Sequence, residues 1–124
     1  MRLSVTLLAL LCLTAGLLGQ EPCQCRSEPG VGPTFKVHGR LSAWNGTPSL
    51  RIWIVGTKRI LGVHGEEDET ESLPANLRHP PVSFFDNPVY GDFEVCPLTK
   101  SRPGVMQIVC IKSASNLVWT TRNK

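Results

Sequence analysis

The sequence predicts an all-β protein, a small β-sandwich or β-barrel with little helix. Short runs rich in β-branched and aromatic residues recur along the chain, and turn-forming pairs such as Asn-Gly and Gly-Thr separate them at fairly even intervals. Only one short stretch has the composition of a helical turn. The chain has 124 residues, which suits a single domain. Period-two patterns alone do not distinguish a sandwich from a barrel.

Residues 1–19 have the plan of a secretory signal peptide, with an early Arg2, an apolar run over residues 3–13 and small residues before the predicted cleavage. A retained membrane anchor and a lipid-anchored cysteine are the alternatives. Polar residues interrupt the apolar run, no basic stop follows it, and neither Cys12 nor Cys23 follows the small residues of a lipoprotein site. We therefore expect a secreted, extracellular or periplasmic protein with no stable membrane insertion after cleavage.

Four cysteines remain without the leader: Cys23, Cys25, Cys96 and Cys110. An even number in a small exported chain predicts two disulfides. A Cys23–Cys25 bridge is the least favourable pairing, because residues two apart on an extended chain point the same way; the other two pairings stay open and need Cys96 and Cys110 on neighbouring strands. Each bridge would contribute about 4 kcal/mol by closing a long loop. Zinc is a weak alternative, since zinc-binding cysteine pairs are usually spaced more widely, and we predict no metal and no cofactor.

The mature chain is expected to begin with an extended arm. Residues 20–33 are rich in Pro and Gly, and residues 34–124 form the predicted single domain. The domain opens with three strands in a meander, the first alternating apolar with polar residues and the second apolar on both faces. Asn45-Gly46 and Gly56-Thr57 favour the two turns. The strands are expected at 35–43, 50–55 and 59–63.

The second half of the domain continues with short strands around one helical turn. The run 65–72 carries five acids and predicts a solvated loop; a calcium site is the alternative, but the run lacks the alternating acid offsets and the internal glycine of a calcium loop. Residues 73–79 predict a helical turn, and residues 82–85 a strand or a buried loop. Further strands are expected at 90–96, 105–111 and 116–120, for six or seven in all.

Short motifs in two of these segments resemble the transthyretin-like and carboxypeptidase regulatory-like β-sandwich domains. They are Val37-x-Gly39-Arg40-Leu41 followed by Asn45-Gly46-x-Pro48, and later Gly91-x-Phe93-x-Val95. The chain also looks like small exported bacterial proteins. The superfamily resemblance implies a disulfide-supported Greek-key β-sandwich of about seven strands, used as a binding or accessory domain. It transfers no catalytic residue.

The leading functional prediction is a binding module for an unknown protein or small-molecule ligand. Candidate contact residues are Trp44, Trp53 and Trp119, because exposed indoles favour interfaces, although packing in the core or at a sheet edge explains each of them as well. Basic residues of the meander could form a modest face for an anionic partner: Arg40, Arg51, Lys58 and Arg59. Asn45-Gly46-Thr47 is a possible glycosylation site at an accessible turn.

Other function classes have less support. The formal charge of +3 is too small to predict a nucleic-acid-binding protein, and we find no phosphate-binding glycine loop and no metal-binding helix motif. We predict no enzyme; a small hydrolase would have to bring His38 or His79 together with Asp86 or Asp92 in a concave site. A structural protein that assembles through an exposed sheet edge is the remaining alternative. Oligomeric state is left open.

Overall fold

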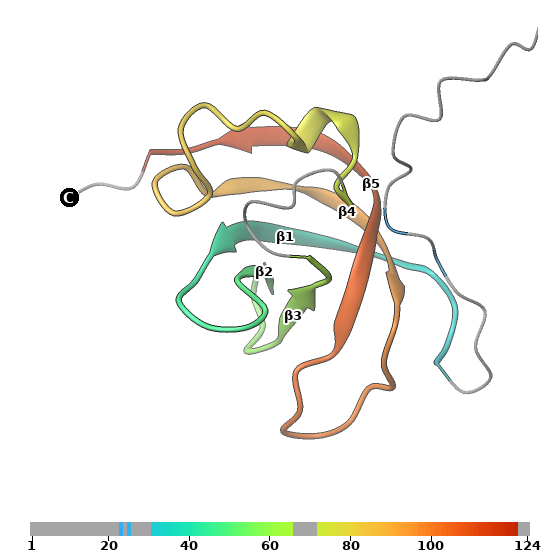
Figure 1. Cartoon of the computed structure of the whole chain (residues 1–124). Coiled ribbons are helices and arrows are strands. Elements are labelled where there is room, and N and C mark those ends of the chain that lie inside the picture. The colour runs from blue at the N-terminus through green and yellow to red at the C-terminus, as the bar shows by residue number, and fades with distance from the viewer. Residues whose placement is uncertain (1–22, 24, 26–30, 66–71, 122–124) are drawn as a thin grey trace, which may run out of the picture.

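The computed structural model describes residues 23, 25, 31–65 and 72–121. The predicted leader, most of the arm and the centre of the acidic run lie outside the described residues. Within them the chain forms five strands and a single-turn 3-10 helix, η2 (Figure 1). Their bounds are β1 Phe35–Ala43, β2 Leu50–Ile54, β3 Ile60–Val63, η2 Ala75–Leu77, β4 Val89–Pro97 and β5 Ile108–Trp119.

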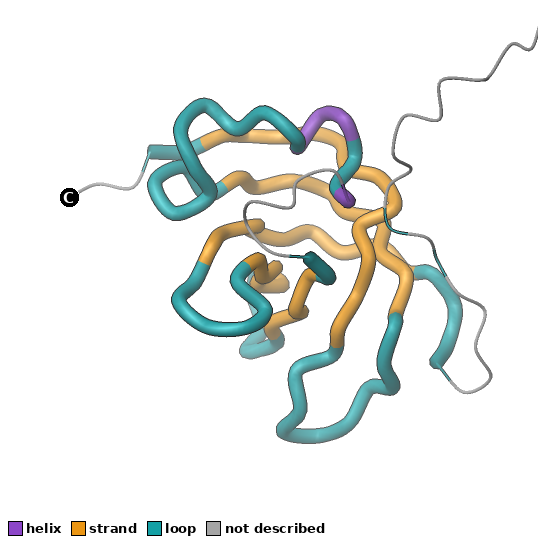
Figure 2. The backbone as a smooth tube through the Cα atoms, in the orientation of Figure 1, coloured by secondary structure: helices purple, strands orange, loops and turns teal. Residues whose placement is uncertain are grey.

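The five strands close into one barrel in the order β1-β2-β3-β5-β4 (Figure 2). β1, β2 and β3 form the predicted antiparallel meander. β4 returns to pair with the free side of β1, which is a Greek-key connection. β5 then pairs antiparallel with β4 and parallel with β3, and so joins the two ends of the sheet. The OB fold is also a five-stranded Greek-key barrel, but an architecture shared among unrelated proteins carries no function by itself.

The predicted seven-stranded sandwich is wrong, because a single sheet closes on itself instead of packing against a second sheet. The strand number differs for two reasons. Residues 82–85, for which a strand or a buried loop was expected, form a loop, and the two strands predicted at 105–111 and 116–120 both overlap the single strand β5. The all-β class with little helix is confirmed.

The core fills the inside of this barrel. Along β1 the apolar residues of the period-two pattern face inward, and Leu41 is fully buried. Gly39 is the one position of that inward face without a side chain: a Cβ there would lie 2.4 Å from Ile52 Cγ2 and 2.9 Å from the Trp53 carbonyl oxygen. Glycine therefore lets β1 and β2 approach each other as the barrel curves. The largest fully buried side chains are Phe84, Phe93, Leu41, Leu50, Ile52, Leu61, Leu73, Leu77 and Ile111.

Residues 72–88, between β3 and β4, pack buried side chains against the barrel core. The helix η2 lies at the predicted helical turn, and its Leu77 is buried in the core. Asn76 Nδ2 donates a hydrogen bond of 2.7 Å to the Ala114 carbonyl oxygen of β5. Further along, the Phe84 ring stacks on Trp119 with centroids 5.8 Å apart. Trp119 therefore packs against the core.

Two disulfides join the N-terminal arm to the last two strands. Cys23 is bonded to Cys110, and Cys25 to Cys96. Cys96 and Cys110 are register partners on β4 and β5, as the sequence predicted. Cys23 and Cys25 reach them side by side, and the Cys23 amide also donates a hydrogen bond to the Ser72 carbonyl oxygen. Of the two pairings left open by the sequence, the structure therefore has Cys23–Cys110 with Cys25–Cys96.

Candidate functional site

Arginine and tryptophan side chains gather on the outer face of β1 and β2. The polar residues of the alternating pattern of β1 point outward. In the antiparallel register, the outward residues near the end of β1 lie opposite residues of β2. Arg40 lies directly opposite Trp53, and Ser42 lies opposite Arg51. Trp44 follows at the end of β1. We call Arg40, Trp44, Arg51 and Trp53 the Arg–Trp face.

The first stack of this face joins neighbouring strands. The Arg40 guanidinium carbon lies 5.1 Å from the centre of the Trp53 ring, a cation–π distance. Trp53 Nε1 donates a hydrogen bond of 2.7 Å to the Thr57 carbonyl oxygen in the β2–β3 turn, which fixes the indole orientation. Arg40 Nε is buried and has no hydrogen-bond partner within the described residues. The guanidinium is therefore held by stacking.

The second stack joins Arg51 of β2 to Trp44, in the turn after β1. The Arg51 guanidinium carbon lies 5.6 Å from the centre of the Trp44 ring. Arg51 Nε donates to the Pro48 carbonyl oxygen at 3.0 Å, and Trp44 Nε1 donates to Ser42 Oγ at 3.0 Å. Trp44 is 39 % exposed, so part of its ring surface is open to solvent. The sequon residue Asn45 lies in the same exposed turn.

Within the described residues 31–65 and 72–121, no carboxylate forms an ion pair with the two arginines of the Arg–Trp face, Arg40 and Arg51. The other two basic residues predicted for a basic face lie at the β2–β3 turn. Lys58 is exposed there, and Arg59 lies 5.6 Å from the Phe35 ring and donates a hydrogen bond to Gln107 Oε1.

A second group of polar side chains lies on the outer face of β1, β4 and β5, in a groove of about 390 Å³. At its centre His38 and Asp92 are register partners. His38 Nδ1 donates a hydrogen bond of 2.9 Å to Asp92 Oδ1, and Asn116 Nδ2 donates one of 2.8 Å to Asp92 Oδ2. These two bonds, that of Asn116 first, lower the pKa of Asp92 below its ordinary value. The groove is lined by Lys36, Val37, His38, Asp92, Phe93, Glu94, Ser113 and Ser115.

The groove brings together one pair named in the hydrolase alternative, His38 with Asp92, but not in a hydrolytic arrangement. Ser115 is the register partner of Asp92 on β5, while His38 is its partner on β1. The serine and the histidine are therefore two strands apart, about 10 Å, with the acid between them. A nucleophile–base pair needs the histidine within hydrogen-bond reach of the serine. Asp86 lies elsewhere and accepts a hydrogen bond from Ser83.

The remaining candidates are dispersed. Trp119 packs on Phe84 and belongs to the core side of β5, so only two of the three predicted contact tryptophans share a face. His64 and His79 are exposed. No group of three or more metal-ligating side chains is found in the described part of the chain. Nor do the described residues contain a helix long and apolar enough to cross a bilayer.

Sequence reasoning missed Tyr90 and Asn116. Tyr90 of β4 lies opposite Arg40, on the side away from Trp53. Both residues become neighbours of the site only through the pairing of β4 with β1 and β5. The period-two pattern of β4 signals that Tyr90 faces outward, but no local signal specifies the partner strand.

No family model, curated protein or solved structure matches the chain. The resemblance to transthyretin-like domains consequently stays a prediction.

Proposed function

We propose that this chain is an exported binding module that uses the Arg–Trp face to hold an anionic ligand built on a ring. The observation that carries this proposal is the pair of arginine–indole stacks, Arg40 on Trp53 and Arg51 on Trp44. Each stack presents a positive charge beside an aromatic surface. Carboxylates and sulfates on a ring-shaped ligand would satisfy both features at once.

Stacking suits the guanidinium for this role. An arginine stacked on an indole can still offer the N–H groups of its two terminal nitrogens, and such groups bind carboxylate or sulfate oxygens in pairs. Each stack is held in position: the Trp53 and Trp44 N–H groups bond within the protein, and Arg51 Nε is anchored to the turn. Little side-chain freedom then remains to be lost on binding, which favours affinity.

The same observations give less support to the two competing functions, a hydrolase and a structural protein that assembles through a sheet edge. A hydrolase lacks a serine next to His38, as the strand order shows. A protein that assembles through a sheet edge would use backbone groups, whereas the feature that stands out is a set of side chains on a sheet face. The predicted leader and the two disulfides, which persist in oxidising compartments, support the export that we propose.

The proposal is tested by intrinsic tryptophan fluorescence, because Trp44 and Trp53 belong to the binding face. The probe is a disaccharide of glucuronate and N-acetylglucosamine, and the matched neutral probe is a disaccharide of N-acetylglucosamine alone. We expect saturable binding of the acidic disaccharide that weakens as salt is added, and no binding of the neutral one.

Charge-removing variants localise this binding. Arg40→Gln and Arg51→Gln should each weaken the acidic disaccharide at least about tenfold, the effect of losing a charge-assisted hydrogen bond. Arg102→Gln is the matched control, since Arg102 is an exposed arginine in the loop between β4 and β5. Equal weakening in all three variants, or none in the first two, would refute the assignment of the face.

A further inference from the structure

The Arg–Trp face continues without interruption into the polar groove. On β1, His38 and Arg40 are two residues apart and point to the same side; on β4, Asp92 and Tyr90 do the same. Arg40 is thus flanked by Trp53 on β2 and Tyr90 on β4. From β2 to β5 this outer surface spans three interstrand spacings, about 14 Å. One extended ligand can therefore contact both parts.

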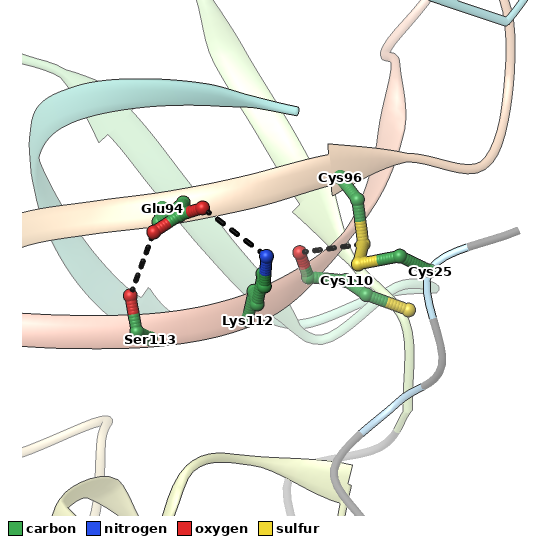
Figure 3. A network of polar contacts seen from close by, with 6 residues as sticks. All are labelled: Cys25, Glu94, Cys96, Cys110, Lys112 and Ser113. Atoms are coloured by element: carbon green, nitrogen blue, oxygen red, sulfur yellow. Dashed lines mark hydrogen bonds and ion pairs between the residues drawn. A yellow bond between two sulfur atoms is a disulfide. The ribbon is translucent and has the colours of Figure 1, made fainter. Parts of the chain in front are cut away.

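The carboxylates of the groove are held in fixed positions. Asp92 is held by His38 on one oxygen and by Asn116 on the other. Two residues further along β4, Glu94 Oε2 accepts a hydrogen bond of 3.3 Å from Ser113 Oγ, and Glu94 Oε1 lies 3.5 Å from Lys112 Nζ (Figure 3). These contacts, all from neighbouring strands, leave lone pairs of both carboxylates available to a ligand.

The chemistry of the groove differs from that of the Arg–Trp face. Two carboxylates, Asp92 and Glu94, would repel a phosphate, sulfate or carboxylate placed beside them. A hydroxyl group instead donates to a carboxylate and accepts from Lys36 or Ser115, so it matches both kinds of partner. The groove volume of about 390 Å³ lies in the range of small-ligand sites, about 300–1,000 Å³. The groove therefore suits an uncharged, hydroxyl-rich ring.

We infer that the ligand is an acidic polysaccharide in which charged and uncharged sugar rings alternate, with a charged ring on the Arg–Trp face and an uncharged ring in the groove. This inference rests on the proposed function and extends it from an anionic ring to a chain of defined charge pattern. A nucleic acid fits less well, because a phosphate on every unit would meet Asp92 and Glu94.

The inference is tested by the dependence of affinity on ligand length. The probes are methyl glucuronide, which carries the charged ring alone, the disaccharide of glucuronate and N-acetylglucosamine, and a galacturonate dimer that is charged on both rings. We expect the mixed disaccharide to bind at least about tenfold more tightly than methyl glucuronide, since a second contact on the same ligand adds to the first. The galacturonate dimer should gain less than about threefold over its monosaccharide, because a charged ring would enter the groove.

Two groove variants locate the gain. Ser115→Tyr fills the groove from the exposed face of β5, and Asp92→Asn removes an acceptor charge without changing shape. Both should bind methyl glucuronide, which occupies only the Arg–Trp face, as the wild type does, but reduce the tenfold gain of the disaccharide to about threefold or less. Ser101→Tyr, in the exposed loop between β4 and β5, is the matched control and should keep the gain.

The outcomes separate the two proposals. If the disaccharide binds no more tightly than methyl glucuronide, or both groove variants keep the gain, the inference is overturned while the Arg–Trp face stands. If the wild type ignores the disaccharide, or Arg40→Gln and Arg51→Gln bind it normally, the proposed function fails and the inference fails with it. Tighter binding of a single-stranded oligonucleotide than of any sugar would overturn the assignment of ligand class.

Discussion

Asp92 of β4 connects three strands on the outer surface, because its side chain is hydrogen-bonded to residues of β1 and β5. Its two carboxylate oxygens accept hydrogen bonds from different strands, one from His38 of β1 and one from Asn116 of β5. An ionised carboxylate only accepts hydrogen bonds, so both bonds favour the charged form. The result is a fixed negative charge at the centre of the groove.

The lowered pKa of Asp92 makes stability depend on pH in a defined direction. Because the folded-state pKa lies below the unfolded value, about 3.9, the contribution of Asp92 is complete above that pH and is lost as the pH falls through the folded pKa. Asn116→Ala removes the largest cause, so the pKa of Asp92 should rise towards its ordinary value. A carboxyl-carbon NMR titration measures this rise. Ser115→Ala, which leaves both bonds in place, should not change the titration midpoint.

At the scale of elements, β5 determines how the barrel closes. It is the longest strand, and Figure 1 shows that it bends, so that its first residues lie beside β3 and its later ones follow β4. Two register shifts with β4 occur along its length, between Glu94 and Val95 and between Tyr90 and Asp92. At the second shift Asn116 has φ 52°, in the left-handed region that Asn tolerates better than most residues. This bulge aims the Asn116 amide at Asp92.

Variants at Asn116 test the bulge. Asn116→Val places a β-branched residue at positive φ and should destabilise the fold by about 1–3 kcal/mol, measured by urea unfolding. Asn116→Gly keeps the backbone conformation at little steric cost and loses only the bond to Asp92. The valine variant should therefore be clearly less stable than the glycine variant. Equal stabilities of the two would show that the backbone conformation at residue 116 is not required.

The same bulges explain which parts of the fold the sequence could predict. The meander β1–β3 was predicted with its turns, because its alternating pattern and its Asn-Gly and Gly-Thr signals are local. β5 was predicted as two strands, because each register shift breaks the period-two alternation and the polar segment 112–116 resembles a loop. Closure into a barrel depends on the pairings of β4 with β1 and β5 with β3, which no local pattern specifies.

The candidate site likewise has a part that the sequence predicted and a part that depends on long-range strand pairing. The four residues of the Arg–Trp face were named as candidates from the sequence, since they lie on one meander whose register follows from its turns. Of the groove, the sequence named only the pair His38 and Asp92, in the hydrolase alternative, because Lys36 and His38 meet Glu94 and Asp92 only across the β1–β4 pairing.

For the whole molecule, the two disulfides act as one clamp between the arm and the barrel. Their partners are two residues apart on the arm and are register neighbours on β4 and β5. The bridges span sequence separations of 87 and 71 residues. Once one is closed, the other closes a ring of only 16 residues, which is the difference between those two separations. The two contributions to stability are therefore unequal and depend on the order of removal.

This nesting predicts that removing both bridges lowers the free energy of unfolding by about 1–2 kcal/mol more than the sum of the two single removals. In the chain-entropy picture a ring of about 16 residues contributes about 3 kcal/mol, and a loop of about 87 residues contributes about 4.6 kcal/mol. Cys25→Ser with Cys96→Ser, or Cys23→Ser with Cys110→Ser, should therefore each lower the free energy of unfolding by about 3 kcal/mol, whereas replacing all four cysteines should lower it by about 7–8 kcal/mol. Urea unfolding of the three proteins measures this. A fourfold variant that loses only as much as one pair would contradict the nested-loop account, and since domains are stable by about 5–15 kcal/mol, we expect that variant to be close to unfolded.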